Sequence, residues 1–377
     1  MKKILIVFGT RPEAIKMAPL IKEFEQHSNY FNIKICNTGQ HKEMLDQVLE
    51  IFEIKPHYNI NIMNKNQSLS DITSKIIKNF ENILLEFQPE LVFVHGDTST
   101  TFAASLACFY NNIPVAHVEA GLRSFDLRLP FPEEANRKLT SQIAKYHFAP
   151  TELNAKNLVK EGIEEENIIV TGNTVIDALY STINLIKRTN RELRVKKLLS
   201  THEINLEKKF ILVTGHRRES FGEGLQNICA ALGEIADKNP SIDIIYPVHL
   251  NPNVKNIVDS QLNSFENIKL IPPLDYETFI YLMQKSYFII TDSGGIQEEG
   301  PSIGKPVLVT RVSSERPEAI NEGVVNLVGY EKNKIVKYAQ KLINNESYYI
   351  KMSSNTKVYG DGTASQAIVQ FCIKNLI

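Results

Sequence analysis

The chain has 377 residues with 42 basic and 43 acidic side chains, so its formal net charge is -1. This balance excludes the broad basic surface by which proteins bind nucleic acid or anionic lipid. The hydrophobic fraction of 43% and the charged fraction of 23% are those of a globular protein, and the length predicts two domains. No apolar stretch is long enough to span a membrane, and the first apolar run, residues 4–8, is too short for a signal peptide. We therefore expect a cytoplasmic protein.

The chain shows no sequence signature of a metal or of a redox cofactor. Its four cysteines are scattered, without a CxxC pair or a zinc-ligand spacing, and we expect them to be buried reduced thiols. The GxGxxG signature of dinucleotide-binding folds is missing after every candidate strand, which argues against a nicotinamide or flavin enzyme. We expect neither a metal nor a cofactor.

Short β-branched runs alternate with helical patterns along the chain. One series of candidate strands comprises residues 4–8, 33–37, 91–95, 114–118 and 168–170, and a second comprises residues 210–214, 242–247, 268–271, 288–291 and 306–310. Several of these runs are apolar throughout, as parallel strands are when helices cover both faces of their sheet. Helical patterns such as residues 13–25 and 364–376 accompany them, and the charged stretch 185–209 separates the two series. The alternation predicts two doubly wound α/β sheets.

In open α/β sheets, ligands bind beyond the carboxyl ends of the strands. After the first strand, Pro12 suits the first position of a helix, with Arg11 just before it and Lys16 about one turn further on. Both cationic side chains could reach an anion at this end of the sheet. A solvated helix face is the alternative for Lys16.

Three carboxylates follow later strands of the first series. Asp97 and Glu119 lie directly after strands, and Glu133 lies a little further along the chain. Acids gathered on one rim suit proton abstraction and donation, because a shared environment can separate their pKa values. The alternative for Asp97 is simple capping of the helix that follows.

In the second series, two loops have the character of an anion site. The run after residue 214 carries His216, Arg217 and Arg218, which suit phosphate oxygens. After residue 291 the chain continues as DSGGIQEE, where the N–H groups of a glycine turn before a helix attract phosphate. Glu299, one turn further on, could bind the two hydroxyls of a ribose. This run predicts a socket for a nucleotide diphosphate; an ordinary turn capped by Ser293 is the alternative.

Seven motifs, in order, resemble those of the non-hydrolysing UDP-N-acetylglucosamine 2-epimerases. They are residues 9–13 (GTRPE), 95–98 (HGDT), 117–123 (HVEAGLR), 214–219 (TGHRRE), 246–252 (YPVHLNP), 291–299 (TDSGGIQEE) and 315–318 (ERPE). The match covers nearly the whole chain. Any one motif is weak, but seven in order are specific.

The resemblance implies a GT-B-like fold, in which two Rossmann-like domains with doubly wound parallel sheets face each other across a cleft. In such a fold the last helix crosses back to the first domain. The implied N-terminal domain comprises residues 1–172 with 360–377, and the implied UDP-binding domain comprises residues 173–359. Homodimers are usual in the family.

The implied activity is the reversible inversion of UDP-N-acetylglucosamine at C2, which gives UDP-N-acetylmannosamine. A base takes the C2 proton while UDP leaves from C1, and 2-acetamidoglucal forms. UDP then adds back as a proton returns on the other face. Such an elimination needs a base, stabilisation of the departing diphosphate and a closed, dry site.

Carried over by position, Asp97, Glu119 and Glu133 resemble the catalytic acids, without an assignment of the one that takes the proton. His216 resembles a group that contacts UDP and assists its departure, and Arg137 is expected to orient Glu133. The positions that match UDP-sugar contacts are Arg11, Lys16, Arg137, Phe279, Ser293, Gly294, Gly295, Glu299 and Arg316.

Some bacterial members of the family bind a second UDP-N-acetylglucosamine as an activator. Gln40, His41 and His249 match that allosteric site, but Glu43 and Asn66 stand where those members carry Gln and Arg. Loss of the arginine removes a phosphate contact, so we expect weak activation by substrate or none.

Four other functions are compatible with parts of the pattern. An epimerase of a different UDP-sugar, such as a 2,3-diacetamido uronate, and a hydrolysing relative that releases free sugar would both differ at the first motif. A retaining GT-B glycosyltransferase would share the glycine turn but not three acids on the N-terminal rim. A catalytically silent UDP-sugar sensor would not need Asp97, Glu119, Glu133 and His216 intact.

Overall fold

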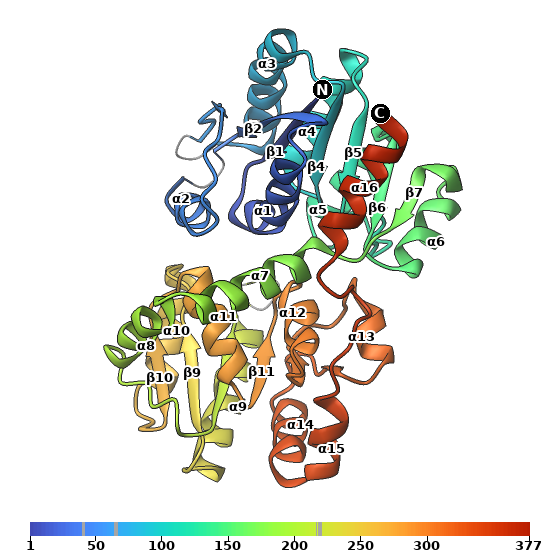
Figure 1. Ribbon diagram of the computed structural model, residues 1–377. Helices are drawn as coiled ribbons and strands as arrows, with labels where there is room; N and C mark the ends of the chain where they lie inside the picture. Colours follow the sequence, from blue (N-terminus) through green and yellow to red (C-terminus); the bar gives the residue numbers. More distant parts are fainter. Residues whose placement is uncertain (40–41, 64–66, 216, 218–220) are drawn as a thin grey trace. The chain divides into compact units, whose positions relative to one another are not determined.

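The computed structural model describes residues 1–39, 42–63, 67–215, 217 and 221–377, with residues 42–44 described without their side chains. The chain forms two compact units, Met1–Ser181 with Tyr359–Ile377, and Thr182–Val358. Each unit contains its own parallel sheet (Figure 1), so the predicted α/β class with two Rossmann-like sheets is confirmed. The chain leaves the first unit within α7 (Thr174–Arg188). The domain bounds expected from the family stay a prediction.

The first unit contains a sheet of seven strands in the order β3-β2-β1-β4-β5-β6-β7. The chain adds β2 and β3 on one side of β1 and then returns to add β4 to β7 on the other. This is the Rossmann order, in which the crevice for a ligand lies where the order reverses, here between β1 and β4. The strands are β1 (Lys2–Phe8), β2 (Phe31–Asn37), β3 (Tyr58–Asn59), β4 (Leu91–His95), β5 (Val115–Val118), β6 (Tyr146–Ala149) and β7 (Ile168–Val170).

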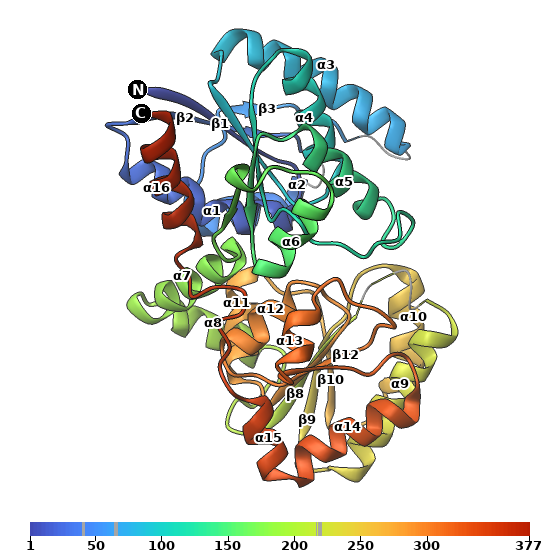
Figure 2. The same cartoon turned by 90° about the vertical axis from the view of Figure 1, so that its right-hand side faces the viewer.

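Helices cover both faces of this sheet. Helices α3, α4 and α5 pack in a row on one face, and α1 and α16 pack together on the other (Figure 2). The last helix thus lies on the first unit, where the Phe371 ring contacts the rings of Tyr146 and Phe148 at centroid distances of 5.2 and 5.5 Å. The helices of this unit, besides α7, are α1 (Arg11–Gln26), α2 (Lys42–Ile51), α3 (Leu69–Phe87), α4 (Ser99–Tyr110), α5 (Glu133–Ile143), α6 (Glu152–Lys160) and α16 (Ala364–Leu376).

The helices that follow β1 and β4 begin at local capping signals. Thr10 and Glu13 form a capping box at the start of α1, and Pro12 occupies one of its first positions as predicted. At the start of α4 the cap is Thr98, whose hydroxyl accepts the N–H of Thr101 at 3.1 Å. The alternative of Asp97 as the capping residue is therefore wrong, which leaves its carboxylate available for other contacts.

The second unit contains a sheet of six strands in the order β10-β9-β8-β11-β12-β13, which repeats the Rossmann pattern with its reversal between β8 and β11. The strands are β8 (Phe210–Thr214), β9 (Asp243–Pro247), β10 (Ile268–Ile271), β11 (Phe288–Thr291), β12 (Val307–Val309) and β13 (Val325–Leu327). The helices are α8 (Arg191–Ser200), α9 (Glu223–Lys238), α10 (Pro252–Leu262), α11 (Tyr276–Lys285), α12 (Ile296–Ser302), α13 (Pro317–Asn321), α14 (Lys332–Asn344) and α15 (Glu346–Met352).

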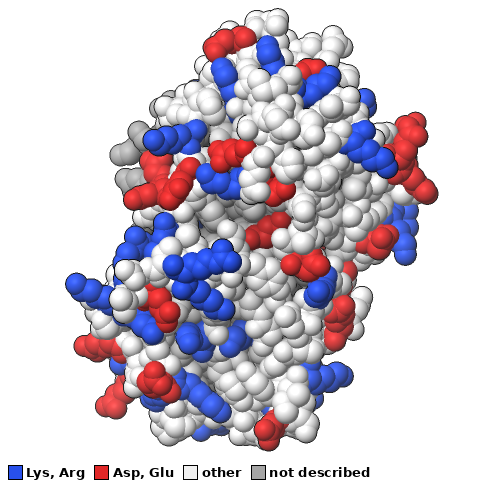
Figure 3. Space-filling model, viewed as in Figure 1, with Lys and Arg blue, Asp and Glu red and all other residues white. Residues whose placement is uncertain are grey.

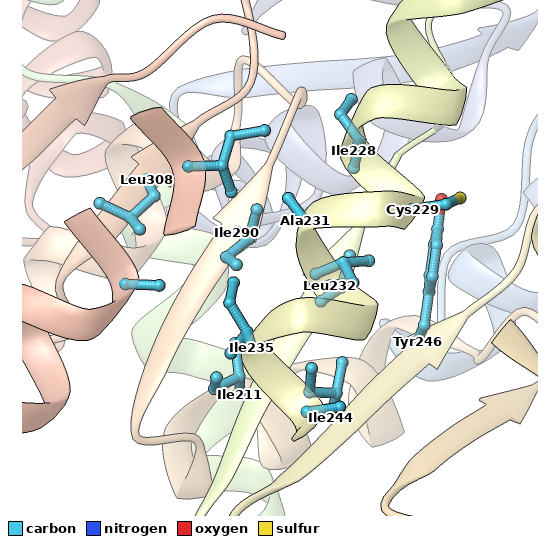
Figure 4. Packing of buried hydrophobic residues seen from close by; sticks show 14 of the residues in the cluster. Ile211, Ile228, Cys229, Ala231, Leu232, Ile235, Ile244, Tyr246, Ile290 and Leu308 are labelled. Carbon is cyan, nitrogen blue, oxygen red and sulfur yellow. The ribbon is translucent and has the colours of Figure 1, made fainter. Parts of the chain in front are cut away.

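A buried core cluster of the second unit joins α9, α10 and α14 to the strands of the sheet. Leu232 and Ile235 of α9 pack in one buried cluster with Ile211, Ile244 and Ile290 from three neighbouring strands (Figure 4). Burial of each such side chain contributes about 1.5–3 kcal/mol relative to an exposed one. The strands that carry the anion-site loops are thereby held rigidly from one side.

All ten predicted strands exist, each within two residues of its expected ends. Three strands were missed. β3 has two residues and β13 has three, while β6 reads Tyr-His-Phe-Ala and lacks the β-branched residues that mark the others. The charged stretch 185–209, expected to be a break, contains α8, whose Val195 and Leu199 are buried in the second unit.

The described residues agree with two other features of the composition. Cys36, Cys108, Cys229 and Cys372 are buried and free of disulfides. Among the described residues, no helix combines the length and the apolar character that crossing a bilayer requires. Basic and acidic side chains occur together on both units over the face shown in Figure 3.

Candidate functional site

Glu119 is the centre of the site in the first unit. It directly follows β5, has a left-handed backbone with φ 63°, and is 7% exposed. Its Oε2 atom forms an ion pair with the ammonium of Lys16 and accepts a hydrogen bond from Nδ2 of Asn173 at 2.7 Å. Nε2 of His95 lies 3.8 Å from the same oxygen. This buried carboxylate therefore has one cationic donor and one neutral donor on the same oxygen.

Asp97 follows β4 and lies at the reversal point of the sheet. Its carboxylate forms an ion pair with Arg137 of α5, and its backbone carbonyl accepts Nδ2 of Asn136 at 2.9 Å. Nη1 of Arg137 lies 3.2 Å from Glu134, which is fully buried. The Asp97 side chain keeps 24% of its exposure, whereas that of Arg137 keeps 5%. Arg137 thus orients one accessible acid from a buried position.

Glu133 opens α5 and is half-buried. The next residue, Glu134, accepts the backbone N–H groups of Ser124 and Phe125 at 3.0 and 3.2 Å, which pins the loop that leads into this helix. The expected contact of Arg137 with Glu133 stays a prediction.

Three buried histidines lie on adjacent strands beneath these acids. His117 of β5 is paired in register with His147 of β6, and Nε2 of His117 lies 2.7 Å from the carbonyl oxygen of Gly96. Burial lowers the pKa of His95 and of His117 to about 4 and that of His147 to about 3. All three are therefore neutral at pH 7, and a cation beside Glu119 comes from Lys16 rather than from an imidazolium.

Glu13 joins the loop after β1 to the loop after β4. One carboxylate oxygen accepts the N–H groups of Gly9 and Thr10 at 3.0 and 2.8 Å, and the other accepts the hydroxyl of Thr98 at 2.7 Å. Burial raises the pKa of Glu13, and these hydrogen bonds oppose the rise. The contact fixes both sides of the reversal point, which is the place where an α/β sheet binds its ligand.

In the second unit, the residues after β11 form the predicted glycine turn, and α12 begins at Ile296. The N-cap residue of α12 is Gly295, so Ser293 is not the residue that caps this helix. The diphosphate socket stays a prediction. The first N–H groups of any helix lack partners within the helix and favour an anion. A Cβ on Gly294 would lie 2.7 Å from Nη1 of Arg316, so glycine is needed for the guanidinium to lie against the turn.

Acidic side chains fix this guanidinium. Nε of Arg316 forms an ion pair with Glu298, and its Nη1 donates to Glu315 at 2.6 Å. Glu299 follows Glu298 in α12. It is 6% exposed and accepts a hydrogen bond from the hydroxyl of Tyr276 at 3.0 Å. The loop after β8 is tied to the same turn, because the N–H of Arg217 donates to the Asp292 carboxylate at 2.8 Å. The charged groups of this unit are therefore oriented before any ligand binds.

The other predicted site residues lie in separate places. Arg11 opens α1 and is half-buried, and Phe279 lies half-buried on α11. His249 follows β9, and its Nδ1 accepts the N–H of Asn251 at 3.1 Å. Four predicted residues lie outside the described part of the chain: Gln40, His41, His216 and Arg218. Among the described residues, no group of three or more His, Cys, Asp or Glu side chains is placed to hold a metal ion.

The sequence analysis gave no role to several polar groups of the site, among them His95 and Asn173. His95 belongs to the HGDT motif, in which only Asp97 was given a role. Asn173 follows the strand of residues 168–170 and was considered only as a domain boundary. A polar residue after a strand end was a usable signal for Asn173, but its contact with Glu119 joins residues 54 positions apart.

Comparison with known proteins shows which family this chain resembles. The family model "UDP-N-acetylglucosamine 2-epimerase" matches residues 22–373. The UDP-N-acetylglucosamine 2-epimerase of Campylobacter jejuni is 57% identical over 376 residues, which cover 99% of this chain and 98% of that protein. The crystal structure of the Neisseria meningitidis enzyme bound to UDP-GlcNAc is 51% identical, with a TM-score of 0.95 and coverage of 99% and 100%.

A more distant relative preserves the same fold. The Methanocaldococcus jannaschii UDP-GlcNAc 2-epimerase, solved in complex with UDP-GlcNAc and UDP, is 34% identical with a TM-score of 0.87, and the match covers 99% of this chain and 100% of that one. These matches extend over both sheets and over both clusters described above. The chain belongs to the UDP-N-acetylglucosamine 2-epimerase family.

Proposed function

We propose that this protein interconverts UDP-N-acetylglucosamine and UDP-N-acetylmannosamine by elimination and re-addition of UDP, without hydrolysis. Family membership and the UDP-GlcNAc bound by the Neisseria relative support the substrate class. The observation that carries the proposal is the set of acids after β4 and β5, where Asp97 and Glu119 are each paired with a cation. A carboxylate in such a place can exchange a proton with a carbon acid.

The first unit supplies the acids of this reaction. One of Asp97, Glu119 and Glu133 accepts the C2 proton while the C1–O bond breaks and its electron pair leaves with UDP. The product is 2-acetamidoglucal. In the return step UDP adds to C1, and an acid on the opposite face donates a proton to C2. Glu119 is the most constrained of the three, since it is buried and held by Lys16 and Asn173.

The second unit supplies most of the proposed contacts to UDP. The turn Ser293-Gly294-Gly295 and Arg316 bind the diphosphate, because backbone N–H groups and a fixed guanidinium match its oxygens. Glu299, oriented by Tyr276, accepts the ribose hydroxyls. Of the other UDP-sugar contacts expected from the family, Phe279 belongs to this unit, whereas Arg11 and Lys16 belong to the first unit. His216, outside the described residues, assists the departure of UDP.

We also propose that UDP-GlcNAc activates this enzyme weakly or not at all. Of the allosteric residues expected from the family, Gln40, His41 and His249, none is an ion-pairing arginine, and Asn66 stands at the position that carries arginine in activated members. The measurement is the initial rate against UDP-GlcNAc concentration. A hyperbolic curve is expected, and a sigmoidal curve that requires UDP-GlcNAc would contradict this part of the proposal.

We also propose a homodimer that works in the cytoplasm. Leu85 of α3 and Phe109 and Tyr110 of α4 are exposed apolar side chains on neighbouring helices, as an interface between copies requires. Four free buried thiols fit a reducing compartment. Sedimentation velocity of the wild type and of Tyr110→Lys tests the dimer, which the variant should weaken.

The test of the proposed function is a proton NMR time course with UDP-GlcNAc in D₂O. The expected result is UDP-N-acetylmannosamine with deuterium at C2, and loss of the C2 proton signal from both epimers. Release of free sugar and UDP would identify a hydrolysing enzyme instead. An unchanged UDP-GlcNAc spectrum, with exchange upon addition of another UDP-sugar, would overturn the substrate assignment.

A further inference from the structure

The two donors to Glu119 differ in how well they define its position. Lys16 carries its ammonium on a flexible four-carbon stem, so this cation can follow the carboxylate as it moves. Asn173 has a short side chain, is 2% exposed, and donates from Nδ2 to Oε2 of Glu119 at 2.7 Å. The amide is therefore the donor that fixes where the carboxylate lies.

The amide of Asn173 is itself held from two sides. Its Oδ1 atom accepts the N–H of Val175 at 3.2 Å, which forms a turn and leaves Nδ2 facing Glu119. Its backbone N–H donates to the carbonyl of Tyr359 at 2.7 Å. Tyr359 begins the C-terminal segment that returns to the first unit, and this segment passes the start of α7 (Figures 1 and 2).

A pair of glycines makes this contact between the two segments possible. Gly172 and Gly360 have φ values of +84° and +109°, where a side chain is strained. A Cβ on Gly360 would lie 3.1 Å from Cα of Gly172, so the two backbones touch. One turn into α7, Asp177 accepts the N–H of Ser365 at 2.7 Å, which ties the start of α16 to the same place.

Glu119 needs such support because its backbone is in an unfavourable conformation. A non-glycine residue with φ 63° is in a conformation that L side chains rarely adopt, and this conformation persists only where the surroundings over-determine it. A carboxylate displaced by about 1 Å costs an enzyme about 100-fold in rate. A fixed amide donor on one oxygen prevents such a displacement.

We propose that Asn173 is a positioning residue, which holds the Glu119 carboxylate in the geometry for proton transfer at C2. This inference rests on the proposed epimerase function. The competing explanation is a purely structural asparagine that stabilises the turn between β7 and α7. The two explanations differ in kcat, because a structural residue changes the amount of folded protein and not the rate of each folded molecule.

Two variants separate these explanations. Asn173→Asp keeps Oδ1 for the N–H of Val175 but places a carboxylate oxygen against Glu119. Asn173→Ser also keeps an acceptor for the turn, and its hydroxyl is too short to reach Glu119. The matched control is Asn267→Asp in the second unit, where the amide donates only to the carbonyls of Ala236, Asn239 and Ile242.

The measurements are kcat and KM for UDP-GlcNAc, the Kd for UDP and the Tm of each full-length protein. Both Asn173 variants should lose about 100-fold in kcat, with KM and the Kd for UDP unchanged. Asn267→Asp should lower the Tm and leave kcat unchanged. If Asn173→Asp does not fold, Asn173→Ser decides the question.

Unchanged kcat in a folded Asn173 variant, with only a lower Tm, would overturn the positioning role while the wild type still epimerises. A fall in UDP affinity that accounts for the whole loss would overturn it as well. A wild type that exchanges no proton at C2 of UDP-GlcNAc would overturn the proposed function and this inference together. The wild-type control therefore distinguishes the two failures.

Discussion

The two units share one strand order but carry opposite chemistry at the same place. Where the order of the first sheet reverses, carboxylates meet single cations, as in the Lys16–Glu119 and Arg137–Asp97 pairs. At the corresponding place in the second sheet, the Arg316 guanidinium meets two acids and a glycine turn. The fold thus fixes where a ligand binds, and the side chains after the strands decide what is done to it.

The surroundings of the two clusters differ in a way that fits this division. The acids of the first unit lie near neutral histidines, and Lys16, Asn173 and Arg137 donate to them. In the second unit, acids hold Arg316 in place before the ligand arrives, and a preorganised cation loses less entropy on binding. Variants of the two clusters should therefore fail in different ways.

The largest expected effect is on turnover in Glu119→Gln. The amide cannot take up a proton, so we expect a loss of about 10³-fold in kcat, as for removal of a general base. The matched control is Glu161→Gln, which removes a structural carboxylate that holds Arg123 at 2.6 Å. This control should lower the Tm and leave kcat unchanged. An equal loss of kcat in both variants would contradict a specific role of Glu119, because any change of charge in the first unit would then lower kcat.

A smaller effect, on the free energy of unfolding, is expected from a substitution at Gly121, two residues after Glu119. Gly121 has φ +91°, and a Cβ there would lie 2.3 Å from the carbonyl oxygen of Asn154. We expect Gly121→Ala to lower the free energy of unfolding by about 3 kcal/mol, from backbone strain and overpacking together. Gly162→Ala, with φ +85° and open space, isolates the strain and should cost about 1 kcal/mol. Urea denaturation measures both, and equal losses would refute the clash.

Acid should weaken the first unit more than the second. His95, His117 and His147 have folded pKa values well below 6.5, so below pH 6.5 the unfolded chain binds protons that the folded chain does not. The free energy of unfolding should fall by about 2 kcal/mol per buried histidine between pH 7 and pH 5. Glu13 opposes this slightly, because burial raises its pKa.

Hydrogen exchange of the full chain at the two pH values, corrected for intrinsic rates, locates this change. Peptides of the first unit should lose protection at pH 5 more than those of the second. The described histidines of the second unit, His202 and His249, are half-buried and exposed. Greater loss in the second unit would contradict the assignment to the buried histidines.

The smallest effect is expected on UDP affinity in Gly294→Ala. The new methyl group would meet Nη1 of Arg316 at 2.7 Å, and this guanidinium cannot retreat from Glu298 and Glu315 without breaking its ion pairs. We expect the Kd for UDP, measured by calorimetry, to rise at least about tenfold. Gly295→Ala should weaken binding less, because its methyl would meet nothing closer than Glu299 at 3.5 Å.

The sequence predicted most of this architecture because local patterns carry it. Apolar runs located the long strands, and Thr10 with Pro12 located the start of α1. The short strands β3 and β13 are formed by their neighbours in the sheet, and no local pattern marks them. β6 was missed because it contains the polar His147 and lacks β-branched residues.

Many residues of the site could be predicted from the sequence, but the contacts between them could not. The acids after the strands and the glycine turn could be read from the sequence, since strand ends meet at one edge of a sheet. The partners of these groups could not. Asn173 reaches Glu119, and Glu13 reaches Thr98, only because the fold joins residues 54 and 85 positions apart.

We expect proton transfer to depend on the first unit and UDP binding to depend mainly on the second. The most direct test measures C2 deuterium incorporation at saturating UDP-GlcNAc, and the Kd for UDP, in Glu119→Gln and Gly294→Ala side by side. We expect a crossed result: Glu119→Gln loses exchange and keeps UDP affinity, while Gly294→Ala loses UDP affinity and keeps exchange at saturation. If both variants lose the same property, the division between the two units is wrong.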